Sequence, residues 1–367
     1  MPRLRWPSDH DGECAHHGPE RPAEESVGET GKTTGKNVMT VFYQDPMTQI
    51  LLGDVRAELA LLPDQYVQMC VTSPPYWGLR DYQVKGQIGP EPMPEAYVQT
   101  MVKVFHDVRR VLKDDGTLWL NLGDSYASAW ACKRRNVVGA GSPDKSVERG
   151  RMAEGLKEKD LVGIPWRVAF ALQADGWYLR SDIIWAKPNP MPESVTDRPT
   201  KAHEYLFLLS KSERYYYDAE AIHEESIYPE DDRASREDSR RGTGYNNISF
   251  RQSVERGGFD GKTNTMPGRE AFRAIRQFRN KRSVWTIATA PFPDAHFATF
   301  PPKLIEPCIL AGSRTGDLVL DPFHGAGTSA LVSKQLGRRY IGIDLNESYL
   351  KMSLKRLEQE VLPLEAP

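Results

Sequence analysis

The sequence has little cysteine and no long apolar run. Its 367 residues include only Cys14, Cys70, Cys132 and Cys308, with no CxxC pair. This spacing argues against a disulfide framework or a zinc ribbon, and no metal site is expected. No apolar stretch reaches the ~18 residues that cross a bilayer, and the first residues lack the apolar core of a signal peptide. We therefore expect a cytoplasmic protein.

A charge of one sign is also lacking over the whole chain. Lysine and arginine number 48 against 50 acidic residues, for a formal charge of −2. A local basic patch is what attracts nucleic acid, however. Residues 233–282 hold thirteen basic and five acidic residues, a net charge of +8. With aromatic residues interleaved, this stretch suits contacts to phosphates, and the alternative is a solvated loop.

Apolar periodicity divides the chain into four parts. Residues 1–37 lack it and are expected to form a flexible tail, whereas residues 229–283 form a basic insert. Between them, residues 38–228 alternate strands with helices, and residues 284–367 do the same. An amphipathic helix over residues 94–112 is followed by a KDDG turn and the strand TLWLNLGDSY. This alternation predicts a doubly wound, mostly parallel, Rossmann-like α/β sheet.

A glycine turn between two strands near the C-terminus predicts a nucleoside cofactor. The passage DLVLDPFHGAGTSALVSKQLGRRYIGIDLN spans residues 317–346. Gly325 and Gly327 allow a tight turn and close approach of a ligand to the backbone. Asp344 ends the second strand, where a carboxylate can accept hydrogen bonds from two ribose hydroxyls. An ordinary tight turn is the alternative, and Ala330 in place of a third glycine gives no support for NAD.

A second motif, Thr72-Ser73-Pro74-Pro75-Tyr76, directly follows the apolar strand VQMCV. Two prolines fix the backbone and remove two donors, which leaves carbonyl groups that can accept hydrogen bonds from an amino group. Ser73 adds another acceptor, and Tyr76 can stack on a planar ring. Alternatives for this motif alone are a rigid turn or a polyproline segment that binds a partner domain.

Together, SPPY followed by DPFHGAGT, with a basic stretch between them, resembles the S-adenosylmethionine-dependent DNA methyltransferases that modify exocyclic amines. The order of the motifs resembles their β class. The resemblance covers roughly residues 48–355. It includes GTLWLNLGDSY, the W-x-K-x-N-P-x-P passage at residues 185–192, His203-Glu204 and FATFPPKLIEP. The tail and the basic insert fall outside it.

The resemblance implies S-adenosylmethionine as cofactor and double-stranded DNA as partner. Asp344 matches the acid that binds the ribose, and Lys303 is either a contact to the methionine carboxylate or a solvated lysine. A homodimer and a cognate restriction nuclease are left open. The loop around the methionine part of the cofactor matches Asp321, Phe323, Gly325, Gly327 and Thr328.

The resemblance further implies that the target base is flipped out of the duplex. Ser73 and the Pro74 carbonyl then accept the two amine hydrogens while Tyr76 stacks on the base, and Pro75 keeps the turn rigid. Serine at position 73 favours the N4 amine of cytosine, with the N6 amine of adenine as the alternative. A near rival is an RNA methyltransferase, and two rivals from other classes are a catalytically silent nucleic-acid-binding relative and an NAD-type oxidoreductase.

Overall fold

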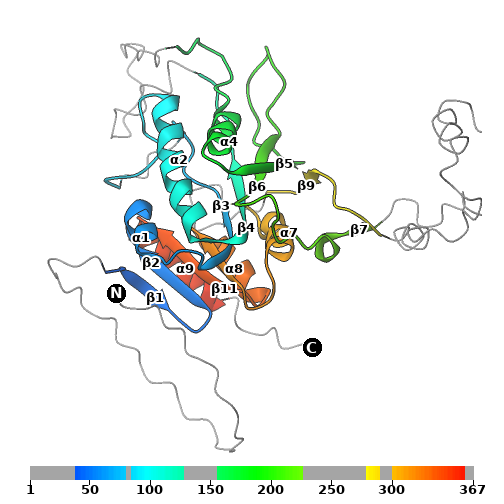
Figure 1. Cartoon of the computed structure of the whole chain (residues 1–367). Coiled ribbons are helices and arrows are strands. Elements are labelled where there is room, and N and C mark those ends of the chain that lie inside the picture. Colours follow the sequence, from blue (N-terminus) through cyan, green and yellow to red (C-terminus); the bar gives the residue numbers. More distant parts are fainter. Residues whose placement is uncertain (1–37, 80–83, 128–154, 226–277, 290–299, 360–367) are drawn as a thin grey trace, which may run out of the picture. The chain divides into compact units, whose positions relative to one another are not determined.

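The structure, a computed structural model, describes residues 38–79, 84–127, 155–225, 278–289 and 300–359 (Figure 1). The expected tail (1–37) and most of the basic insert (229–283) lie outside these residues. The described residues divide into two compact units: those up to residue 216 together with those from residue 284 onward, and those between residues 217 and 283.

In the first unit, the described residues form a sheet with the strand order β1-β2-β11-β10-β3-β4-β6-β5-β9. The strands β2, β11, β10, β3 and β4 run parallel, which confirms the predicted fold. The reversal of β6 against β4 and β5 was not predicted. The bounds are β1 Val41–Gln44, β2 Thr48–Leu52, β3 Val67–Thr72, β4 Leu112–Leu122, β5 Tyr178–Ala186, β6 His203–Ser210, β9 Val284–Thr286, β10 Leu318–Asp321 and β11 Arg339–Asp344.

The predicted KDDG turn lies inside β4 rather than before it. Leu112 already pairs with Val67 of β3, and the next recorded partners are Thr117 and Met69. Two residues advance on β3 while five advance on β4, so the KDDG residues form an irregularity in the ladder. The prediction of a turn between the helix and the strand was therefore wrong, because these residues belong to β4, which pairs with β3 on both sides of the irregularity.

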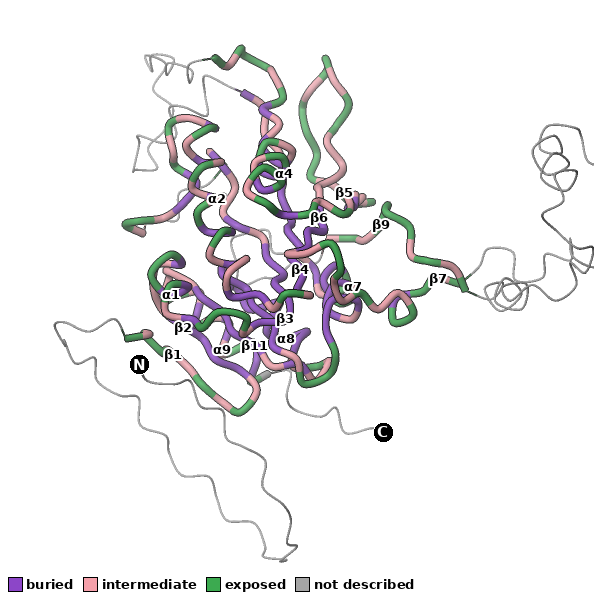
Figure 2. Tube along the Cα trace, in the orientation of Figure 1, coloured by how far each residue is buried: buried purple, intermediate pink, exposed green. Residues whose placement is uncertain are grey.

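Helices form two groups that cover the two faces of the sheet (Figure 1). The first group is α1 Val55–Leu61, α2 Pro94–Val111 and α4 Ile164–Ala174; the second is α7 Pro302–Gly312, α8 Thr328–Gln335 and α9 Glu347–Gln359. The apolar face expected for α2 is confirmed, because Tyr97, Met101, Val104, Phe105 and Val108 are all buried. Buried residues accordingly follow the sheet and the inner sides of the helices (Figure 2).

The second unit contains the helical turn η1 Glu220–Ile222 and a short ladder between β7 Glu224–Glu225 and β8 Phe278–Arg279. Its Glu224 forms ion pairs with Arg279 at 3.3 Å and Arg282 at 3.4 Å. Within the described ranges of the whole chain, none of the helices is long and apolar enough to span a membrane. The same ranges contain no cluster of side chains that could hold a metal ion.

Candidate active site

The two sequence motifs meet at the carboxyl edge of the parallel sheet. β10 pairs with β3 on one side and with β11 on the other. The turns after β3 and β10 and the end of β11 therefore lie beside one another, where open α/β sheets bind their ligands. A hydrogen bond from Thr72 Oγ1 to Asp321 Oδ1, at 2.6 Å, joins the end of β3 to the glycine turn.

Asp321 supports the glycine turn from within the protein. Besides Thr72, its carboxylate accepts a hydrogen bond from the Ser329 hydroxyl at 2.5 Å and from the Phe323 backbone N–H at 3.0 Å. Burial raises the pKa of Asp321 to about 6, although these donors oppose the shift. The sequence analysis predicted that Asp321 binds the cofactor. Its observed contacts hold the loop residues in place, and its contact with the cofactor stays a prediction.

The glycine turn adopts a conformation that favours glycine at two positions. Gly325 has φ +54° and Gly327 has φ +75°. A Cβ atom on Gly327 would lie 2.8 Å from the Cβ of Ser353, so α9 packs directly against the loop. A Cβ on Gly325 would meet only the Phe323 carbonyl, at 3.9 Å. The contact with α9 therefore fixes the loop at Gly327, whereas the described residues leave space around Gly325.

Asp344 and Thr328 complete the loop. Asp344 Oδ2 accepts from the Gly325 N–H at 2.7 Å, and its Oδ1 accepts from the Asn346 N–H at 2.8 Å. Burial raises the pKa of Asp344 despite these donors. A backbone hydrogen bond from Leu345 also reaches this carboxylate. A carboxylate has about four acceptor sites, so capacity remains for a hydrogen bond from the ribose. The Thr328 hydroxyl accepts from Arg356 at 2.8 Å.

A buried histidine that was not predicted from the sequence as a site residue supports this loop. His324 lies between Gly325 and the end of β10, with Nδ1 2.8 Å from the Tyr340 hydroxyl and Nε2 2.8 Å from Ser353 Oγ. Burial lowers its pKa to about 3. The neutral ring therefore connects the loop to β11 and α9.

The neutral state of His324 predicts an acid-sensitive fold. An unfolded histidine titrates near its ordinary pKa, so the unfolded chain binds one more proton between about pH 6.5 and 3. The contribution of His324 is fully present above pH 6.5 and decreases as the pH falls through this window. We expect the His324→Asn variant to lose less of its free energy of unfolding than the wild type between pH 7 and pH 4.5 in urea titrations.

The matched control for His324 is His223→Asn, which removes an exposed imidazole directly after η1. This variant should retain the pH dependence of the wild type. An equal pH dependence in the wild type and in His324→Asn would contradict the role of the neutral ring.

Ser73 and Tyr76 belong to a polar cluster at the end of β3. The Ser73 hydroxyl donates to the Tyr76 oxygen at 3.3 Å, and the Tyr76 hydroxyl donates to Glu204 Oε2 at 2.8 Å. Asn121 Nδ2 also donates to Glu204 Oε2, at 3.2 Å. Lys187 forms an ion pair with the other oxygen of Glu204. Burial, together with the charge of Glu204, raises the pKa of Tyr76 well above its usual value.

The contributions of Asn121, Lys187 and Glu204 were not predicted from the sequence. Lys187 and Glu204 do occur in the passages W-x-K-x-N-P-x-P and His203-Glu204, which were noted for their family resemblance alone. Their meeting depends on the antiparallel pairing of β5 with β6, in which Ala186 lies opposite His203. The signal was therefore in the sequence, but its meaning required the strand pairing.

The proline turn is held rigidly around these side chains. The Pro75 carbonyl accepts a hydrogen bond from the Tyr97 hydroxyl of α2 at 2.9 Å. A Cβ on Gly123, which follows β4, would lie 2.5 Å from Cε2 of Tyr76. The ring of Tyr76 thus packs directly on the backbone of Gly123. Lys303 is exposed in the first turn of α7, and its role stays a prediction.

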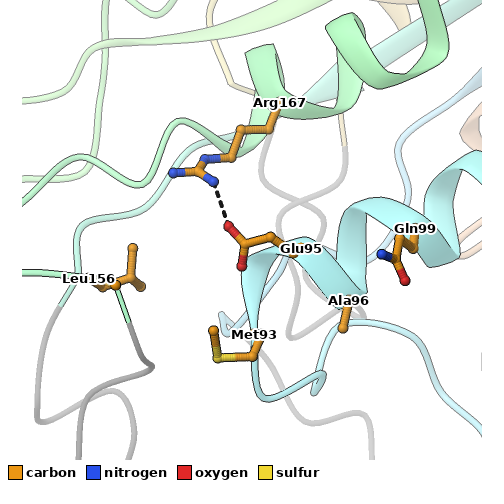
Figure 3. Close-up of a pocket in the computed structure, with 7 residues that line it drawn as sticks. Met93, Glu95, Ala96, Gln99, Leu156 and Arg167 are labelled. Carbon is orange, nitrogen blue, oxygen red and sulfur yellow. Dashed lines mark hydrogen bonds and ion pairs between the residues drawn. The ribbon is translucent and has the colours of Figure 1, made fainter. Parts of the chain in front are cut away.

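A hollow of about 420 Å³ lies elsewhere, between the N-terminal turn of α2 and α4 (Figure 3). An ion pair between Arg167 and Glu95, at 2.7 Å, crosses it. None of the residues of the two motifs contributes to its lining. The candidate site is therefore the edge of the sheet and not this hollow.

Comparison with known proteins agrees with this geometry. A DNA methylase family model matches residues 67–355. The Type II methyltransferase M.Cfr9I of Citrobacter freundii is 46% identical over 314 residues, which cover 84% of this chain and 87% of that protein.

Two solved structures share the fold. The PvuII DNA methyltransferase, described as cytosine-N4-specific, superposes with a TM-score of 0.57 at 18% identity and covers 90% of this chain and 91% of its own. A DNA modification methylase of Thermus thermophilus, described as putative and complexed with S-adenosyl-L-methionine, has a TM-score of 0.50 at 23% identity and covers 85% of this chain and 93% of its own.

Proposed function

The chain belongs to the DNA methylase family, and from this premise we propose that it transfers a methyl group from S-adenosylmethionine to the N4 amine of cytosine in duplex DNA. It is an S-adenosylmethionine-dependent DNA methyltransferase. The choice of base and the role of each residue are the proposal. The observation that carries them is the hydrogen-bonded Ser73–Tyr76 turn next to the glycine loop, joined through Thr72 and Asp321.

The residues of the loop suit this cofactor. Asp344 is assigned to the ribose hydroxyls, and the space around Gly325 admits a ligand close to the backbone. Lys303 is assigned to the methionine carboxylate, where a charge-assisted hydrogen bond is available. When bound, S-adenosylmethionine supplies a methyl group made electrophilic by a sulfonium sulfur.

The proline turn is assigned to the target amine. An exocyclic amine is a poor nucleophile because its lone pair is delocalised into the ring. If Ser73 Oγ and the Pro74 carbonyl accept its two hydrogens, the nitrogen pyramidalises and regains a lone pair for in-line attack. The new N–C bond would replace the bond from the methyl group to sulfur, whose electron pair would stay on sulfur, and one amine proton would then leave to solvent. The Pro75 carbonyl already accepts from Tyr97, which supports Pro74 for this task. Tyr76 is assigned to the ring of the flipped base.

Ser73 supports cytosine as the base, since a serine at this position of the motif favours the N4 amine. The N6 amine of adenine is the alternative, because both amines present the same two hydrogens to the turn. The Type II methyltransferase relative supports a role beside a cognate restriction nuclease. The basic insert is assigned to the DNA phosphates.

Identification of the methylated nucleoside tests this proposal. The full chain is incubated with labelled S-adenosylmethionine and, in separate reactions, unmethylated duplex DNA or RNA of mixed sequence. The digested nucleic acid is then analysed by mass spectrometry. The proposal expects 4-methylcytosine. A product of 6-methyladenine would overturn the assignment of the base, and label in RNA but not in DNA would overturn the substrate class.

A further inference from the structure

Four side chains form a chain of polar contacts that ends at the Ser73 hydroxyl. Lys187, just after β5, forms an ion pair with Glu204 in β6. Glu204 Oε2 accepts the hydroxyl of Tyr76 at 2.8 Å, and the Tyr76 oxygen accepts the hydroxyl of Ser73 at 3.3 Å. The side chains of Lys187 and Glu204 are only 18% and 16% exposed, so little solvent competes with these contacts.

The chemistry of each group fixes the direction of these hydrogen bonds. A phenol has one hydrogen, and an ionised carboxylate can only accept. The Tyr76 hydrogen therefore points toward Glu204, where Asn121 Oδ1 lies as a second acceptor at 3.3 Å. Because the phenol has no second hydrogen, the hydrogen bond between Ser73 and Tyr76 must be donated by Ser73. Burial and the charge of Glu204 both raise the pKa of Tyr76, which keeps this hydrogen on the phenol.

We propose that the Lys187–Glu204 ion pair is a positioning device that turns the Ser73 hydrogen away from the substrate. Through Tyr76, it leaves the lone pairs of Ser73 Oγ directed at the target amine. The inference rests on the proposed function, because it requires a substrate group that only donates hydrogen bonds. It holds for the amine of cytosine and for that of adenine.

This direction matters because a serine hydroxyl rotates freely and can donate or accept. An unconstrained Ser73 would present its hydrogen to the amine hydrogens in part of its orientations, and those orientations are unproductive. The ring that transmits the constraint is itself fixed by its contact with the Gly123 backbone. The alignment is thus built before the substrate arrives, which is how a site assists the transition state without reorganisation.

A double-mutant cycle tests the proposal. Tyr76→Phe keeps the ring but removes the hydroxyl. Glu204→Gln supplies an amide that can donate to the Tyr76 oxygen, which would reverse the direction of the hydrogen bonds between Ser73, Tyr76 and residue 204. Each is expected to lower kcat by about ten- to a hundredfold, the usual effect of an unsatisfied buried partner, with KM for DNA within about twofold. The kcat of the double variant should be no more than about twofold below that of the less active single variant, because both changes break the same series of hydrogen bonds.

Tyr97→Phe is the matched control. It removes another tyrosine hydroxyl that contacts the same turn but takes no part in the hydrogen bonds that lead from Glu204 to Ser73. When Tyr97→Phe is combined with Glu204→Gln, the fold-decrease in kcat should equal the product of the two single fold-decreases. The proposal would be overturned if the fold-decreases in kcat of Tyr76→Phe and Glu204→Gln also multiplied in their double variant. A rise in KM for DNA at constant kcat would overturn it as well, because a structural role would act on binding.

A second cycle covers the case in which Glu204→Gln does not fold, judged by near-ultraviolet circular dichroism and by the Kd for S-adenosylmethionine. Tyr76→Phe should then have less than about a twofold effect on kcat in a Ser73→Ala background, since its target hydroxyl is gone. A full additional loss would overturn the proposal. Activity is counted as total methylated nucleoside, so an adenine product would correct the proposed base and leave the cycle valid.

Discussion

Replacement of Ser73 by alanine is expected to lower kcat by about 10²- to 10³-fold, the usual effect of removing one preorganised hydrogen-bond partner from an active site. Ser73 Oγ is assigned to one hydrogen of the target amine. Without this acceptor, the nitrogen lone pair stays delocalised into the ring at the moment of attack. The Kd for S-adenosylmethionine should stay within about twofold, because the glycine loop is held by Asp321, Asp344 and His324. Single-turnover methyl transfer and calorimetric titration measure the two quantities.

Ser181→Ala is the matched control for this result. Ser181 is a half-buried serine of β5 that lies outside the cluster, and its replacement should leave kcat unchanged. Should Ser73→Ala weaken the binding of S-adenosylmethionine as much as it lowers kcat, the serine would be supporting the loop rather than the amine.

Replacement of Asp344 by asparagine is expected to have the opposite effect. The variant keeps the shape of the side chain and one acceptor oxygen but loses the negative charge that strengthens hydrogen bonds from the ribose hydroxyls. We expect the Kd for S-adenosylmethionine to rise about ten- to a hundredfold, with kcat at saturating cofactor within about threefold of the wild type. Because burial raises the pKa of Asp344, the affinity of the wild type should also weaken as this carboxylate gains a proton in acid.

Asp182→Asn provides the control, since it removes an exposed carboxylate from β5 and should leave the Kd unchanged. If Asp344→Asn reduced kcat at saturating cofactor and left the Kd unaltered, the assignment to the ribose would be wrong.

Local motifs carried most of what the sequence could predict. Glycines with positive φ and a following helix mark the loop at Gly325 and Gly327, and a strand that runs into two prolines marks the turn at Ser73. Both signals lie within a few consecutive residues, so no tertiary structure is needed to recognise them. The alternation of strands and helices likewise predicted the parallel sheet that brings the two turns together.

Contacts between distant residues account for what the sequence did not reveal. Tyr76 and Glu204 are 128 positions apart, and His324 meets Ser353 across 29 positions. Such contacts depend on which strands are neighbours and in which direction they run. The turn residue His324 also looked like an ordinary loop position, because only folding brings Tyr340 and Ser353 to its two nitrogens.

The contacts of Asp321 were likewise not predictable from its motif. Its place at the start of the glycine turn suggested a contact with the cofactor. In the structure its two oxygens accept from Thr72, Ser329 and the Phe323 N–H. The motif therefore did not reveal that Asp321 supports the loop, while its predicted contact with the cofactor stays a prediction.

A crystal structure of the full chain with duplex DNA and a non-transferable analogue of S-adenosylmethionine tests the central claim most directly. The account predicts a flipped cytosine with its N4 atom at about 2.7–3.2 Å from both Ser73 Oγ and the Pro74 carbonyl, and with its ring against Tyr76. The donor group of the analogue should lie in line with N4. A target base that remains stacked in the duplex, or an amine directed away from Ser73, would contradict the account.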